Sequence, residues 1–128
     1  EDIGIVLGQA FKKALGDKKG INRAGFFAFP MDETMAIFSV DIAGRPYLKF
    51  DAKFKREKIG ELDTDLIKEF FQAFSSNLEA NIQIISFEAN TDHHKAEAIF
   101  KAFGKAMKMA CSKDPRAKED VPSTKGIL

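Results

Sequence analysis

The positions of apolar residues along the chain predict a mixture of helices and strands. Residues 2–16 (DIGIVLGQAFKKALG) repeat apolar side chains at helical spacing and end near a glycine. Residues 34–44 alternate instead, with Ala36, Phe38 and Val40 on one face. The predicted helices are 2–16, 62–78 and 92–111; the predicted strands are 21–33, 34–44, 47–54 and 81–87. This order predicts an α+β protein in which helices cover a sheet.

Composition narrows the classes of function. The chain has 128 residues, enough for one compact unit with its own core. Its 20 basic and 19 acidic residues nearly cancel, which disfavours nucleic acid and membrane surfaces as partners. A nucleic-acid-binding module is therefore the least favoured class. The single cysteine, Cys111, cannot form an internal disulfide, and the first residues do not resemble a signal peptide, so we expect a cytoplasmic protein.

The first and last predicted helices resemble each other in sequence. When Glu1 is placed on Glu97, six of fifteen positions are identical. The identical pairs are Glu1/Glu97, Ile3/Ile99, Gly8/Gly104, Ala10/Ala106, Lys12/Lys108 and Ala14/Ala110. Shared helical periodicity is one explanation, and a duplicated fold is the other. Duplication predicts a pair of histidines before Glu1, in a part of the protein that precedes this chain.

The last predicted helix carries the clearest chemistry. His93 and His94 are the chain's two histidines, and they lie four and three residues before Glu97. Each can share a helix face with that carboxylate. The two side chains diverge by about 100° around the helix axis. This divergence suits histidines that bind two different metal ions, or that bind one ion from two faces. Imidazole and carboxylate donors favour Mn, Zn or Fe over Ca or Mg. The alternative is a solvated helix start with Asp92 as its cap.

These motifs resemble one known family. HHKAEAIFKAFGKAM, PMDET, DIAGRPYLKFDAKF and VPSTKGIL look like segments of imidazoleglycerol-phosphate dehydratases, and EDIGIVLGQAFKKALGDKKGI looks like the segment after that family's first HHxxE motif. The resemblance implies a duplicated sheet-plus-two-helices repeat of the ribosomal protein S5 domain 2-like type, most of whose first copy lies outside this chain. The expected parts are the last helix of the first repeat (1–18), a complete second repeat (19–112) and a C-terminal tail with a phosphate-binding PSTKG (113–128).

The resemblance also implies the site residues. Two manganese ions per active site would lie between subunits of a large homo-oligomer. The expected metal ligands are Glu1, Glu69, His93, His94 and Glu97. Glu69 is included because some members have a ligand histidine just before the double phenylalanine. The expected phosphate-binding residues are Arg23, Arg45, Lys101, Ser123 and Lys125, and such side chains suit a phosphate dianion. Asp32 is a candidate catalytic residue.

The activity implied by the resemblance is a manganese-dependent hydro-lyase reaction of histidine biosynthesis. It converts imidazole glycerol phosphate to imidazole acetol phosphate, with the metals acting as Lewis acids and as a template. Gln83 departs from the family pattern, because it stands where a histidine is expected. A non-catalytic relative or fragment, which keeps the fold and the assembly surfaces without a complete metal site, is the alternative function.

Overall fold

The computed structural model describes residues 1–117 and 119–126, which form three helices and six strands. The helices are α1 (Asp2–Leu15), α2 (Asp65–Leu78) and α3 (Asp92–Cys111). The strands are β1 (Ala24–Met31), β2 (Thr34–Asp41), β3 (Tyr47–Asp51), β4 (Lys58–Ile59), β5 (Leu62–Asp63) and β6 (Asn81–Ser86). The predicted α+β class and order of elements are confirmed. The short strand β4 lies in a charged segment where no element was predicted. Strand β5 occupies the first two residues of the predicted helix 62–78, which begins at Asp65 instead.

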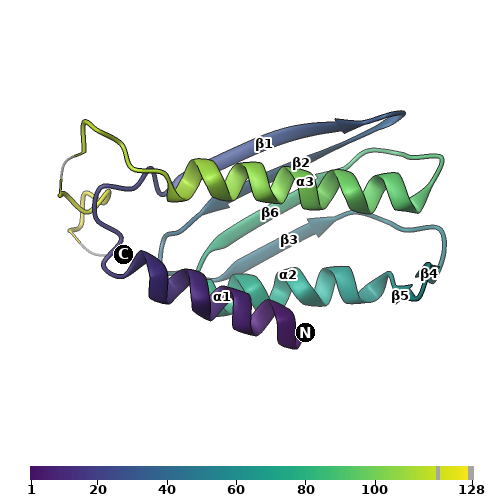
Figure 1. The fold of residues 1–128 in the computed structure, drawn as a ribbon, viewed down its shortest axis with the longest axis horizontal. Helices are drawn as coiled ribbons and strands as arrows, with labels where there is room; N and C mark the ends of the chain where they lie inside the picture. Colours follow the sequence, from purple (N-terminus) through teal and green to yellow (C-terminus); the bar gives the residue numbers. More distant parts are fainter. Residues whose placement is uncertain (118, 127–128) are drawn as a thin grey trace.

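Four strands form one mixed sheet in the order β1-β2-β6-β3. Strands β1 and β6 both pair antiparallel with β2, whereas β3 runs parallel to β6. All three helices lie on one side of this sheet, with α3 across β1 and β2 and α2 beside β3 (Figure 1). The opposite face is exposed and includes the aromatic side chains of Phe26 and Tyr47.

The core lies between the sheet and helices α2 and α3. Ala36, Phe38 and Val40 are buried there, so the predicted inward face of β2 is confirmed. Phe38 packs against Phe71 of α2 and Phe103 of α3. Burial of these rings is the main stabilising term for this layer, since aromatic side chains remove the largest apolar areas from water.

Helix α1 lies alongside α2 (Figure 1). Gly4 and Gly8 are buried at this contact. A Cβ atom at Gly8 would collide with the Phe74 carbonyl and with Asn77, so the two helices approach more closely than side chains would allow. Gln9 also donates a hydrogen bond to Asn77. The close packing fixes the start of α1 beside α2.

The C-terminal tail folds back against the loop that follows α1 (Figure 1). The backbone N–H of Asp114 donates to the Gly20 carbonyl, and the N–H of Gly20 donates to the Asp120 carbonyl. Residue 118 and the last two residues of the VPSTKGIL segment, 127–128, lie outside the described residues. None of the described helices is both long and apolar enough to cross a membrane.

Candidate functional site

The two histidines begin α3 and point in different directions, as predicted from their spacing. The His93 side chain is 69% exposed and the His94 side chain 27%, and their ring centroids are 6.1 Å apart. The helix cap is Thr91 rather than Asp92, because the Thr91 hydroxyl accepts the backbone N–H of His94 at 3.2 Å. Each ring therefore has its own surroundings.

His94 faces the tip of the β1–β2 hairpin. Its Nδ1 lies 2.8 Å from Oε2 of Glu33, and its Nε2 lies 3.6 Å from Oδ2 of Asp32. The hydrogen bond to His94 lowers the pKa of Glu33 to about 2, and the same bond raises the pKa of His94. At neutral pH Glu33 is an anion, and its contact with His94 brings the hairpin and the helix together.

His93 faces Glu97, one turn further along α3. Its Nε2 lies 3.3 Å from Oε2 of Glu97, whose other oxygen receives the Lys101 ammonium at 2.6 Å. The Lys101 hydrogen bond lowers the pKa of Glu97, with smaller contributions from the charges of Lys101, His93 and His94. The pKa of Glu97 is therefore held low, and its carboxylate lies beside the His93 ring, where an ion could take an oxygen and a nitrogen donor together.

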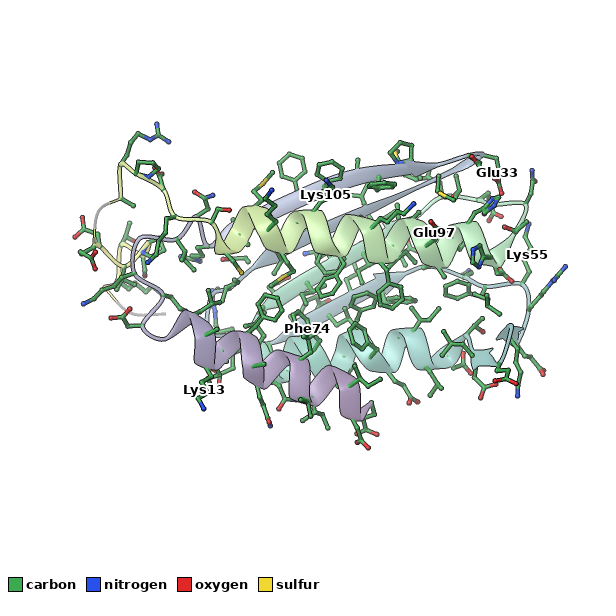
Figure 2. All side chains as sticks on the ribbon, viewed as in Figure 1. Lys13, Glu33, Lys55, Phe74, Glu97 and Lys105 are labelled. Carbon is green, nitrogen blue, oxygen red and sulfur yellow. The ribbon has the colours of Figure 1, made fainter. Side chains whose placement is uncertain are left out.

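The start of α3 is held from a second side by the segment after β3. The buried Asp92 carboxylate accepts the backbone N–H groups of Lys55 and Arg56 at 2.8–3.1 Å. Lys95, 2% exposed, donates its ammonium to the carbonyl of Lys53. These buried charges are satisfied by backbone partners, which makes the helix start a fixed platform. Figure 2 shows Glu33, Glu97 and Lys55 at the same end of the molecule.

The two other predicted ligands, Glu1 and Glu69, lie together in a different place. They line one pocket between the start of α1 and the outer side of α2, with Ile5, Gln72 and Ala73. A neighbouring apolar pocket joins Glu1 to Phe70 of α2 and Phe100 of α3. The sequence alone did not show that Glu1 and Glu69 would share a pocket.

Three of the predicted phosphate-binding residues gather at the opposite end of α3. Arg23 donates from Nε and Nη2 to the two carboxylate oxygens of Asp41, at 2.6 and 3.0 Å, and these hydrogen bonds raise the pKa of Arg23. Its Nη1 donates to the carbonyl of Pro122 at 2.8 Å, beside Ser123, whose hydroxyl accepts the N–H of Lys125. Arg23, Ser123 and Lys125 thus lie near one another, while Arg45 is exposed between β2 and β3.

The predicted ligands and most of the phosphate-binding residues do not form one site within a single chain. The Arg23 N–H binds the carbonyl of Ala110, at the end of α3. Ala110 lies about 24 Å along the helix axis from His94, from the rise of 1.5 Å per residue. Lys101 is the exception, because it lies near the ligands and contacts Glu97 directly. One small phosphorylated substrate could not span both ends of α3.

The donors at the start of α3 fit a divalent transition metal. Ligand atoms of Asp32, Glu33 and His94 lie within 4.8 Å of one another, and Glu97 adds a carboxylate that contacts His93. Imidazole nitrogen and carboxylate oxygen are the donors that Mn, Zn and Fe accept. Sequence reasoning missed Glu33. The sequence placed Glu33 at the end of the predicted strand 21–33. Its partner His94 lies 61 residues away, and only the tertiary fold brings the two together.

The fold and this site define an α+β protein with a candidate divalent-metal centre at the start of a helix. The chain belongs to the imidazoleglycerol-phosphate dehydratase family, whose model matches residues 1–107. It is 56% identical over all 128 residues to the imidazoleglycerol-phosphate dehydratase of Geobacter metallireducens and 53% identical to that of Clostridium botulinum, covering 65% of each.

A solved structure gives the same result for the fold. The crystal structure of imidazoleglycerol-phosphate dehydratase from Staphylococcus aureus superposes with a TM-score of 0.85 at 45% identity, over 88% of this chain and 66% of that chain. The chain therefore spans about two thirds of the length of the relatives that it matches, and the remaining third of those proteins has no counterpart here.

Proposed function

We propose that this chain is part of an imidazoleglycerol-phosphate dehydratase, a lyase of histidine biosynthesis. The observation that supports this most directly is the family match over residues 1–107, which includes the complete His93-His94-Glu97 motif. The reaction removes a carbon-bound proton and a hydroxyl group from imidazole glycerol phosphate. The resulting enol becomes the ketone of imidazole acetol phosphate.

The proposed metal ligands are Glu1, Glu69, His93, His94 and Glu97, for two manganese ions. The divergence of the two histidine rings supports the binding of a separate ion by each ring. The pocket that Glu1 and Glu69 share supports a second group of carboxylate donors. Bound manganese would supply Lewis-acid polarisation of the substrate. Asp32 remains a candidate for proton transfer, because its carboxylate lies 3.6 Å from the His94 ring.

The proposed phosphate-binding residues are Arg23, Arg45, Lys101, Ser123 and Lys125. Arg23 uses three N–H groups on Asp41 and Pro122, so two of its five remain for a phosphate. Since Arg23 and His94 lie at opposite ends of α3, one copy of this chain does not bring both residues to the same small substrate. This separation supports active sites between subunits of a homo-oligomer.

We further propose that α1 ends a first repeat and that residues 19–112 form the second. The support is the exposure of Ile3 and Val6 on α1, which correspond in the helix alignment to the buried Ile99 and Ala102 of α3. In α3 this face packs on β1 and β2. A second sheet, from the additional third of the longer relatives, would cover the same face of α1.

The proposal is tested on the longest gene product that contains this chain. Metal analysis and conversion of imidazole glycerol phosphate are measured for the wild type, Glu97→Gln and Glu88→Gln. Glu88 is the matched control, since its exposed carboxylate meets only the Lys55 ammonium, at 3.6 Å, among the described contacts. We expect Glu97→Gln to lose bound manganese and at least about 100-fold in turnover, and Glu88→Gln to retain both.

A non-catalytic relative is the second candidate, and Gln83 is the observation that favours it. Gln83 lies exposed on the sheet, between Ser39 of β2 and Lys49 of β3, where the family pattern has a histidine. A wild-type protein that binds no manganese and does not convert the substrate would support this candidate and contradict the dehydratase proposal.

A further inference from the structure

Glu33 joins three partners at the start of α3. It follows Asp32 in the two-residue turn between β1 and β2, where Asp32 adopts a positive φ of 46° and Met31 pairs with Thr34. A turn with positive φ at its first central residue suits the twist of a hairpin. The tip of this hairpin consequently reaches the end of the molecule where α3 begins (Figure 2).

The two carboxylate oxygens of Glu33 have different hydrogen-bond partners. Oε1 accepts the backbone N–H groups of Asn90 and Thr91 at 2.8 and 3.3 Å. Oε2 lies 2.8 Å from Nδ1 of His94. With one oxygen held by the backbone and the other by the ring, the carboxylate fixes both the loop before α3 and the orientation of the imidazole.

This contact decides which ring nitrogen carries the proton in neutral His94. An ionised carboxylate only accepts hydrogen bonds, so the nitrogen that faces it must be Nδ1–H. The lone pair then lies on Nε2. Asp32 is 3.6 Å from Nε2, beyond hydrogen-bond length, and leaves that lone pair free for a ligand bond.

We propose that Glu33 is a positioning residue, which holds His94 in the Nδ1–H form so that Nε2 is the atom that binds the metal. This inference rests on the proposed function, since it assumes that His94 is a ligand. Histidine ligands commonly donate their other ring N–H to a carboxylate, which fixes the tautomer and orients the ring. His93 differs, because its Nε2 meets Glu97 and its side chain is mostly exposed.

The first test measures the tautomer without metal. The chain has two histidines, so nitrogen-15 NMR of a histidine-labelled sample gives two ring systems, and a His93→Asn variant assigns them. In alkaline buffer we expect His94 to be Nδ1–H in the wild type. In Glu33→Gln the amide oxygen can still accept the Asn90 and Thr91 N–H groups, but its NH₂ group then faces His94, so we expect a shift to Nε2–H.

Thr91→Ala is the matched control. It tests whether the loss of any hydrogen bond at the start of α3 changes the His94 tautomer. It removes another hydrogen bond at this helix start, the one from the His94 N–H to the Thr91 hydroxyl, and leaves Glu33 in place. We expect Thr91→Ala to keep the Nδ1–H form. The same tautomer in wild type and Glu33→Gln would overturn the proposal, as would an equal shift in Thr91→Ala.

The second test titrates Mn²⁺ alone into the longest gene product that contains the chain. We expect Glu33→Gln to weaken Mn²⁺ binding by about 10–100-fold, and Thr91→Ala to weaken it much less. Equal weakening in the two variants would overturn the proposal. A wild-type protein that binds no Mn²⁺ would contradict the proposed function instead, and the tautomer would still decide whether Glu33 controls the His94 ring.

Discussion

Helices α1 and α3 have related sequences but different surroundings. Ile3 of α1 is 75% exposed, whereas the corresponding Ile99 of α3 is completely buried. The same contrast holds for Val6, which is 65% exposed, and Ala102, which is buried. The apolar face that covers the sheet in α3 is therefore uncovered in α1. A hydrophobic stripe identifies the face that a helix can bury, and the partner must come from elsewhere in the fold.

The two helices also differ in the roles of their glycines. Gly8 of α1 is buried against α2, while the corresponding Gly104 of α3 is exposed, with nothing within 4 Å of an added Cβ. Thus α1 is buried on the side where α3 faces solvent. The two similar helices therefore face opposite ways relative to the core of this chain.

The largest expected effect comes from truncating the paired isoleucines. Ile99→Ala should lower the free energy of unfolding by about 3 kcal/mol, because it leaves a cavity in the core. In the 128-residue chain, Ile3→Ala should change it by less than about 0.5 kcal/mol, because the Ile3 side chain is exposed there. Urea unfolding of the two variants measures both values. Equal losses would contradict the difference in burial between Ile3 and Ile99, and would mean that the exposed face of α1 is covered in solution.

The paired glycines should give a smaller effect with opposite signs. Gly8→Ala should destabilise the protein by about 1–3 kcal/mol, because the added methyl group collides with α2. Gly104→Ala should stabilise it by up to about 1 kcal/mol, since alanine favours a helix and the site is open. Thermal and urea unfolding provide the measurement. A stabilised Gly8→Ala variant would show that the contact between α1 and α2 is looser than the structure has it.

Most of the fold could be predicted from the sequence because its elements have clear periodicity. The alternation around Phe38 gave the buried face of β2, and the helical spacing of residues 92–111 matches α3. The β4–β5 hairpin was missed because each strand has two residues, too few for a pattern. The order of the sheet, with β6 between β2 and β3, depends on contacts between distant segments and has no local signal.

The candidate site could be predicted only in part. The spacing of His93 and Glu97 predicted a shared face, and the structure brings them to 3.3 Å. The same spacing argument allowed His94 to meet Glu97, but the structure turns His94 towards Glu33 instead. That contact needs the hairpin tip to lie beside α3. Sequence periodicity describes one element at a time, so it cannot supply such a partner.

The smallest expected effect is the pH dependence of the contact that distinguishes the start of α3. Glu33 has its pKa lowered from 4.5 to about 2, so its contribution is present above pH 4.5 and is lost as the pH falls towards 2. His94 has its pKa raised above 6.5, so its contribution is complete below pH 6.5 and is lost as the pH rises through the folded value. The contact therefore stabilises the protein most between pH 4.5 and 6.5.

Glu33→Gln isolates this contribution. The difference in unfolding free energy between wild type and Glu33→Gln should be largest between pH 4.5 and 6.5 and should shrink on both sides, in urea titrations at several pH values. Lys12→Gln, which removes the ion pair between α1 and Glu79, the residue that follows α2, is the control, because lysine does not titrate in this range. Its difference from wild type should stay constant as the pH rises above 6.5, whereas the Glu33→Gln difference should fall there as His94 loses its proton.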